Sequence, residues 1–264
     1  MPMAAVQRPV KVIATALRDL YAYATFHSES GAYHFRGVYP TYQAAHASIP
    51  ESAKKSFDDP SVAEYFANTH LVFNPSDYPV LFWLNQLMHR DQTLFDFGGG
   101  IGQSFYVYQE HFLSIPDCFR WIVCDVHALA ERGRLLARQR GESRIEFTED
   151  VALCSGVDLF LTCGTLQYLE ADLGMILSRI EQPPRHVLVN RVPVYEGEPY
   201  FTVQHSTHSY SPYKVFNRDL FLEQMKQAGY EKVEQWYLHR SMSIPFHPDK
   251  SVPFYHGFYF RRKD

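Results

Sequence analysis

The residues with the clearest chemical potential lie in one short glycine-rich segment, TLFDFGGGIGQS. An apolar run leads into Asp96, and glycines follow at two-residue intervals with one more between them: Gly98, Gly99, Gly100 and Gly102. Glycines let the backbone turn sharply and leave no Cβ to block a ligand, and the helix that follows presents free N–H groups. The segment predicts a nucleotide-binding loop; an ordinary glycine-rich turn is the alternative.

The spacing of these glycines narrows the kind of nucleotide. The dinucleotide fingerprint G-x-G-x-x-G fails, because its last position is Gln103 when counted from Gly98 and Phe105 when counted from Gly100. A phosphate-binding P-loop fails as well, because no Gly-Lys-Ser/Thr follows. An NAD-using or nucleotide-sugar enzyme is therefore disfavoured.

Two acidic residues after later apolar runs are candidates for further nucleotide contacts. Asp125 ends the run RWIVCD, where nucleotide-binding sheets place a carboxylate that accepts hydrogen bonds from both ribose hydroxyls. A capping role at the next helix is its alternative. Asp150, followed by Val151, comes after the run RIEFTE, and a solvated acidic turn is the alternative there.

A fourth apolar run, from Leu159 to Thr162, leads into the segment CGTLQYL. In an open parallel sheet the ligand occupies the crevice beyond the carboxyl ends of the strands. Thr162 and Cys163 are therefore cofactor-side candidates, and Gln167 and Tyr168 are acceptor-side candidates. For Tyr168, a packed core tyrosine with a hydrogen-bonded hydroxyl is an equally good interpretation.

The segment after the fifth apolar run is rich in polar and aromatic residues, and we expect it to fold over the crevice as a substrate-binding lid. His205 and His208 are candidate general bases, because imidazole titrates near neutral pH; a surface or structural histidine is the alternative. Asn190 and Arg191 are candidate acceptor contacts, with a structural salt bridge as the alternative for Arg191. Tyr39 is a candidate for the acceptor wall.

The two histidines also have H-x-x-H spacing, which raises the question of a metal. A zinc site needs a third ligand, and the sequence contains neither a CxxC pair nor an HExxH motif. No metal is predicted.

Short apolar runs alternate with helical patterns from Thr93 onward, which predicts an α/β fold with a mostly parallel sheet. The runs 232–237 and 254–261 suit an antiparallel pair that closes the sheet edge. Residues 1–80 are predicted to form a helical cap and residues 81–264 the nucleotide-binding domain. The helical pattern over residues 11–26 belongs to this cap or mediates a homodimer.

The composition excludes several classes of protein. With 264 residues, 46% of them hydrophobic, the chain is long enough for a sizeable core. A net charge of −4 argues against a broad nucleic-acid surface. No apolar run is long enough to span a membrane, and no signal peptide is evident, so we expect a cytoplasmic protein with no membrane partner.

The order D-x-G-x-G-x-G in the glycine-rich segment resembles motif I of the class I S-adenosylmethionine-dependent methyltransferases. Across residues 34–260, the segments GVYPTYQAA, YPVLFWL, LQYL, VNRVP and AGY…W together resemble a family of bacterial methyltransferases. Genes of that family often accompany genes for surface-polysaccharide or small-molecule biosynthesis. One departure is Asp125 in CDVH, where the family has a glutamate followed by a proline-containing turn.

This resemblance implies a Rossmann-like sheet that binds S-adenosylmethionine and releases S-adenosylhomocysteine. It implies that Asp96 and the glycines hold the methionine part of the cofactor, and that Asp150 and neighbouring backbone recognise the adenine. The expected reaction is methyl transfer to an oxygen of a small-molecule or glycan acceptor. Nitrogen or carboxylate acceptors, and a non-catalytic methyltransferase-like partner protein, are the alternatives.

Overall fold

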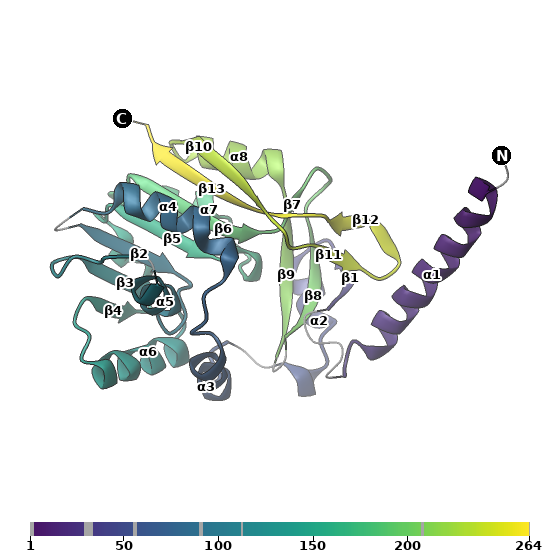
Figure 1. Ribbon diagram of the computed structural model, residues 1–264, viewed down its shortest axis with the longest axis horizontal. Helices are drawn as coiled ribbons and strands as arrows, with labels where there is room; N and C mark the ends of the chain where they lie inside the picture. Colours follow the sequence, from purple (N-terminus) through teal and green to yellow (C-terminus); the bar gives the residue numbers. More distant parts are fainter. Residues whose placement is uncertain are drawn as a thin grey trace.

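The largest element of the computed structural model is a seven-stranded sheet with the strand order β10-β13-β6-β5-β2-β3-β4 (Figure 1). The model describes residues 3–28, 34–54, 57–89, 92–111, 113–206 and 209–263. The strands of the sheet are β2 (Thr93–Phe97), β3 (Arg120–Cys124), β4 (Ile145–Thr148), β5 (Leu159–Cys163), β6 (His186–Val192), β10 (Tyr230–Leu238) and β13 (Tyr255–Arg262).

The order of the strands reverses at β2, which lies between β3 and β5 and pairs with both in parallel. Chain segments leaving β2 and β5 therefore diverge to opposite sides, and a crevice opens where they part. Strand β13 runs antiparallel to β6, and β10 antiparallel to β13. The predicted α/β class, the mostly parallel sheet and the antiparallel C-terminal edge are all confirmed.

Helices cover both faces of this sheet because successive strand residues point to opposite sides. On β2, Leu94 packs with helices α4 (Tyr78–Leu87), α5 (Gln103–His111) and α6 (His127–Arg140). The next residue, Phe95, packs with α7 (Leu173–Ser178) and α8 (Arg218–Gln227) on the other face. Both clusters are apolar, so the sheet is the middle of three layers.

A second, smaller sheet stands beside the first and has the order β1-β8-β9-β7. Its strands are β1 (Phe35–Tyr39), β7 (Val194–Tyr195), β8 (Tyr200–Ser206) and β9 (Ser209–Asn217). The first 80 residues are therefore not the wholly helical cap that their sequence suggests, because β1 forms backbone hydrogen bonds with β8 from the far half of the chain. The segment after β6, predicted to fold over the crevice as a lid, forms β7 and the β8–β9 hairpin of this second sheet.

The remaining elements connect and flank the two sheets. Helix α1 (Met3–Thr25) projects away from the body of the molecule (Figure 1). The others are α2 (Tyr42–Ala47), α3 (Pro60–Thr69), the 3-10 turns η2 (Glu51–Ala53), η3 (Pro75–Asp77), η4 (Val151–Cys154) and η5 (Leu166–Tyr168), and the hairpin of β11 (Met242–Ile244) and β12 (His247–Val252). None of the helices described here has the length and apolarity that a membrane span needs.

One contact in the antiparallel edge connects the sheet to the segment before α4. Gly257 in β13 lies opposite Trp236 in β10, and the indole ring covers it so closely that a β-carbon at Gly257 would sit 2.0 Å from Trp236 Nε1. That Nε1–H donates to Asn190 Oδ1 at 3.0 Å, and Asn190 Nδ2 donates to Asp77 Oδ1 at 3.0 Å. The absence of a side chain at Gly257 therefore lets Trp236 hold Asn190 in place.

We expect Gly257→Ala to displace the Trp236 ring and to lower the free energy of unfolding by about 1–3 kcal/mol, as overpacking does. Urea denaturation followed by tryptophan fluorescence would measure this. Tyr237→Phe is the control, because it changes an exposed ring of the same strand by one hydroxyl and should stay within about 0.5 kcal/mol of the parent. Equal stabilities of all three proteins would contradict the contact.

Candidate active site

The glycine-rich loop after β2 has a backbone that other residues adopt with difficulty. Gly98, Gly100 and Gly102 have φ angles of 71°, 60° and 86°, in the left-handed region. A β-carbon at Gly98 would lie 2.1 Å from Thr165, and one at Gly99 would lie 2.6 Å from the Asp96 carboxyl carbon. The loop therefore approaches its neighbours as closely as the backbone allows, as the sequence predicts for a ligand-binding turn.

Asp96 ends β2 with a buried carboxyl group, 1% exposed. Trp121 Nε1 donates to Asp96 Oδ2 at 3.1 Å, while Asp96 Oδ1 has no hydrogen-bond partner among the described residues. Burial raises the pKa of this carboxyl from 3.8 to about 7, against the hydrogen bond from Trp121, which lowers it. The site thus contains a buried carboxyl group with one oxygen that accepts no hydrogen bond from the described residues.

Asp125 follows β3 and is bonded to the same loop. Its Oδ2 accepts from the Gly100 amide at 2.6 Å and its Oδ1 from the Val126 amide at 2.8 Å. Burial raises the pKa of Asp125 to about 6, while these two backbone hydrogen bonds favour the charged form. Asp125 therefore fixes the conformation of the glycine loop from the neighbouring strand.

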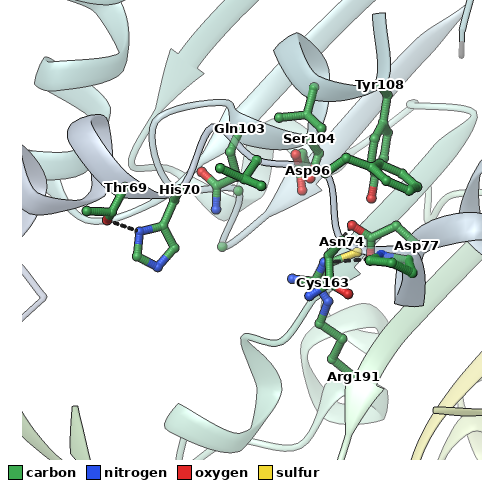
Figure 2. A pocket seen from close by; sticks show the side chains of 16 residues that line it. Thr69, His70, Asn74, Asp77, Asp96, Gln103, Ser104, Tyr108, Cys163 and Arg191 are labelled. Carbon is green, nitrogen blue, oxygen red and sulfur yellow. Dashed lines mark hydrogen bonds and ion pairs between the residues drawn. The ribbon is translucent and has the colours of Figure 1, made fainter. Parts of the chain in front are cut away.

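A cavity of about 330 Å³ lies between the glycine loop and the segment that precedes α4. Figure 2 shows Gln103 and Arg191 entering it from different sides. Its wall consists of Thr69, His70, Val72, Phe73, Asn74, Pro75, Asp77, Asp96, Gly98, Gly99, Gln103, Ser104, Val107, Tyr108, Cys163 and Arg191. The predicted residues Asp96, Gly98, Gly99, Cys163 and Arg191 are thus brought to one cavity from three strand ends.

The polar groups of this wall are unevenly distributed. Three buried oxygens of lining residues have no hydrogen-bond partner among the described residues: Asp96 Oδ1, Gln103 Oε1 and the Tyr108 hydroxyl. The cationic group is Arg191, and burial together with the nearby Arg191 charge lowers the pKa of His70. The cavity therefore offers acceptors in one part and a guanidinium in another.

Arg191, predicted to contact an acceptor or to form a structural salt bridge, forms an ion pair with the buried Asp77. Its Nη2 donates to both carboxylate oxygens of Asp77, and its Nε donates to Ser76 Oγ at 3.1 Å. Burial is the largest influence and lowers the pKa of Arg191, but Asp77, Cys163 and Tyr108 together raise it by more, so the net shift of this pKa is upward. Arg191 has a φ of 62°, rare for a residue with a side chain. Asn190 joins it on Asp77, so neither residue is free to leave this position.

The residues after β5 divide between the cavity and the core. Cys163 lines the cavity with its thiol protonated, because burial raises its pKa well above the ordinary value. Thr162 is fully buried within the strand and does not line the cavity. Gln167 Nε2 donates to the Gly164 carbonyl at 2.7 Å, and the Tyr168 hydroxyl donates to Gln204 Oε1 at 2.7 Å.

Asp150 and Val151 lie beyond the end of β4, on the far side of Asp125 from β2. Asp150 caps the η4 turn, because its Oδ1 accepts from the Ala152 amide at 2.8 Å. Val151 begins that turn and packs against the core. The carboxyl group is exposed, as the alternative of an acidic turn predicts.

The structure does not bring the acceptor-side histidine or Tyr39 to this cavity. His205 lies in β8, 6% exposed, with its ring stacked on Tyr210 at 4.4 Å between centroids and edge-on to Phe26. Tyr39 ends β1 and packs against the cluster of Phe26, Ala45 and neighbouring residues. Both are held in the second sheet, since β1 and β8 pair there. His208 lies outside the described residues.

Several residues of the cavity wall were not predicted from the sequence. The segment 69–77 is not among the residues predicted for the site, yet it supplies His70, Asn74 and Asp77 to the wall. Gln103 served only to exclude a dinucleotide, yet its side chain faces the cavity. The sequence signal for this segment is the polar run NPSD, which comes immediately before the apolar helix that precedes β2.

Comparisons with known proteins concern the fold. No family model matches the sequence, and no curated protein matches it. The structure is similar to that of 1,6-didemethyltoxoflavin-N1-methyltransferase from Burkholderia thailandensis, with bound 1,6-didemethyltoxoflavin and S-adenosylhomocysteine, at a TM-score of 0.52 and 19% identity over 77% of this chain and 85% of that chain. It is also similar to an S-adenosylmethionine-dependent methyltransferase from Clostridium acetobutylicum ATCC 824, at a TM-score of 0.53 and 7% identity over 77% and 98%. The fold is that of S-adenosylmethionine-dependent methyltransferases.

The raised pKa of Asp96 predicts how stability changes with pH. The folded protein binds this proton more tightly than the unfolded chain, so ionised Asp96 destabilises the fold increasingly as the pH rises from about 4 to about 7. Asp96→Asn removes that charge and keeps an acceptor for Trp121. Its stability relative to the parent should therefore rise over this pH range, by at most about 4 kcal/mol.

Urea denaturation at several pH values would measure this difference. Asp219→Asn is the control, because the Asp219 side chain is 79% exposed, and its difference from the parent should change little with pH. If the difference in free energy of unfolding between Asp96→Asn and the parent does not depend on pH, the pKa of Asp96 is not raised in the folded protein.

Proposed function

We propose that this protein is an S-adenosylmethionine-dependent methyltransferase that methylates an oxygen atom of a small-molecule or glycan acceptor. The observation that carries the proposal is the cavity beneath the glycine loop, which presents spare acceptors and a fixed guanidinium to one small space. The methyltransferase fold, shared with neighbours that include one bearing S-adenosylhomocysteine, supports the same cofactor.

The acceptor part of the cavity suits an ammonium group. Asp96 Oδ1 and Gln103 Oε1 are both buried and both lack a partner among the described residues, and an unpartnered buried acceptor is costly until a donor reaches it. An ammonium offers three donors and a positive charge. A cation beside Asp96 would also favour its ionised form, which burial alone disfavours.

The other part of the cavity suits a carboxylate. Asp77 and Ser76 hold Arg191 through Nε and Nη2, and no bond from Nη1 to the described residues is found. Because the guanidinium lines the cavity and is already oriented, little side-chain entropy is lost when it binds an anion. An ammonium and a carboxylate in one ligand are the two groups of an amino acid, and the methionine part of S-adenosylmethionine carries both.

The nucleoside part would extend from the glycine loop toward Asp125 and Asp150. Asp125 uses one lone pair of each oxygen for backbone amides, and a carboxylate has further lone pairs for the ribose hydroxyls. Asp150, with Val151, is the candidate for the adenine end, at the next strand along. Bound S-adenosylmethionine supplies a methyl group on a sulfonium, and the product left is S-adenosylhomocysteine.

This chain contributes to methyl transfer by aligning the reactants and by enclosing the site. The loop, Cys163 and the segment 69–77 enclose the site, and an in-line displacement gains most from such positioning. The packing of His205 in the second sheet gives no support to its role as general base. The association with surface-polysaccharide or small-molecule biosynthesis, and a homodimer through α1, rest on the sequence and stay predictions.

Calorimetric titration tests the cofactor. We expect S-adenosylhomocysteine to bind and NAD not to bind. Gly100→Val should abolish binding, because its backbone has a φ of 60° and a β-carbon would lie 2.5 Å from Gln103 Oε1. Gly141→Val is the matched control: its φ is 62° with open space around it, so it shares the backbone strain and should bind normally. Binding of NAD alone would refute the proposal.

The same titration should depend on pH if Asp96 receives the ammonium. Protonated Asp96 must lose its proton to pair with the cation, so the affinity for S-adenosylhomocysteine should rise by up to about tenfold between about pH 6 and pH 8. Asp96→Asn should bind weakly with no such rise, and Asp219→Asn should behave as the parent does. A parent protein whose affinity is flat across this range would place the ammonium elsewhere.

A further inference from the structure

A second cavity, of about 220 Å³, lies between α2, the residues around η2, η5 and β9. Its wall is formed by Tyr42, His46, Lys54, Phe57, Tyr168, Tyr210, Ser211 and Pro212. Three separate parts of the chain thus contribute to it: the N-terminal segment, the loop after β5 and the second sheet. At this volume it suits a molecule of one or two rings, smaller than a drug-sized ligand.

The wall is mainly aromatic, and its rings are fixed by other rings. Phe57 and Tyr168 meet edge to face with centroids 5.0 Å apart, and Tyr168 meets Tyr213 in the same way at 5.2 Å. Tyr210 is stacked on His205 at 4.4 Å. Rings held in this way present preformed faces and edges to a flat ligand, which stacks on them with little loss of side-chain entropy.

Lys54 supplies the ammonium group of this wall. Lys54 is largely covered, with its side chain 22% exposed, and its ammonium bonds Glu51, whose side chain is 87% exposed, at 2.7 Å. His46 stacks on Tyr42, and none of the described lining residues is acidic. An exposed carboxylate is an easily replaced partner for Lys54, because it returns to water when a ligand anion takes its place.

The cavity is connected to the glycine loop through the segment after β5. Thr165 Oγ1 donates to the Gly98 carbonyl at 3.1 Å, and Tyr168, three residues later, lines the second cavity. On the other side, Phe57 precedes Asp58, whose carboxylate accepts from the Ala128 amide at 2.7 Å next to Asp125. Phe57 and Tyr168, which line the second cavity, are thus one and three residues from side chains that bond the start of α6 and the glycine loop.

We propose that this second cavity binds the methyl acceptor, and that the acceptor is an aromatic molecule of one or two rings whose anionic group pairs with Lys54. This inference rests on the proposed methyltransferase function and adds the class of its substrate. His205 of β8 does not line this cavity, but it stacks on Tyr210, which does.

Binding of naphthoate, measured by calorimetry on the full chain, tests the proposal. Naphthoate should bind the parent, its neutral amide should bind about tenfold more weakly, and cyclohexanecarboxylate should also bind more weakly because it lacks an aromatic face. Lys54→Met should weaken the binding of naphthoate about tenfold and leave the affinity for the amide unchanged. Lys226→Met is the matched control, because Lys226 also pairs with a glutamate three residues before it but lies on the surface of α8.

A second variant tests the space itself. Ser211→Trp places a large side chain in the cavity wall and should abolish naphthoate binding. Titration with S-adenosylhomocysteine is run on every variant, and we expect Lys54→Met and Ser211→Trp to match the parent. That titration also reports whether each variant is folded.

The outcomes separate the two proposals. If S-adenosylhomocysteine binds but naphthoate does not, or if Lys54→Met and Lys226→Met bind naphthoate equally, the acceptor site is wrong and the methyltransferase proposal stands. If S-adenosylhomocysteine fails to bind the parent, the methyltransferase proposal fails. Lys54-dependent binding of naphthoate would then mark a site for aromatic anions, and its assignment to a methyl acceptor would be overturned.

Discussion

The buried carboxylate of Asp77 is the constraint on which the candidate site depends. Its side chain is 7% exposed, so the charge is tolerable only when it is paired and hydrogen-bonded. Arg191 and Asn190, adjacent at the end of β6, supply those partners. Satisfying them brings the segment before α4 against the sheet's carboxyl edge and so forms one wall of the cavity. Arg191 has a strained backbone with a positive φ, and the ion pair of its guanidinium with Asp77 compensates for that strain.

This arrangement allows the same residues a structural and a binding role. A structural salt bridge and a contact with a ligand therefore do not exclude each other at Arg191. A guanidinium has five N–H donors, and the contacts of Arg191 with Asp77 and Ser76 use Nε and Nη2 and not Nη1. Fixing one part of the group orients the other. The same holds for Asp125, which fixes the glycine loop with the carboxylate that is the candidate for the ribose. A site built in this way is preorganised before a ligand enters.

The central sheet could be predicted because its signals are local. The run Thr93–Phe97 is bounded as expected, and the antiparallel edge of β10 and β13 follows from adjacent apolar runs near the end of the chain. The second sheet could not, because β1 is a short strand whose partner is β8, with Phe35 facing Gln204. Pairing at that separation leaves no periodicity near either strand. The helical patterns around β1 then suggested a helical cap.

The same distinction explains which site residues could be found. Asp96 and the glycines act through backbone geometry within one loop, so their types and order carry the information. His205 was chosen for its pKa range and its place after the fifth strand, and neither determines where a strand of the second sheet directs its ring. The described residues of the second cavity come from positions 42 to 212, and no interval between them forms a motif. A cofactor loop is therefore visible in a sequence, whereas an acceptor site becomes visible only when distant segments are folded together.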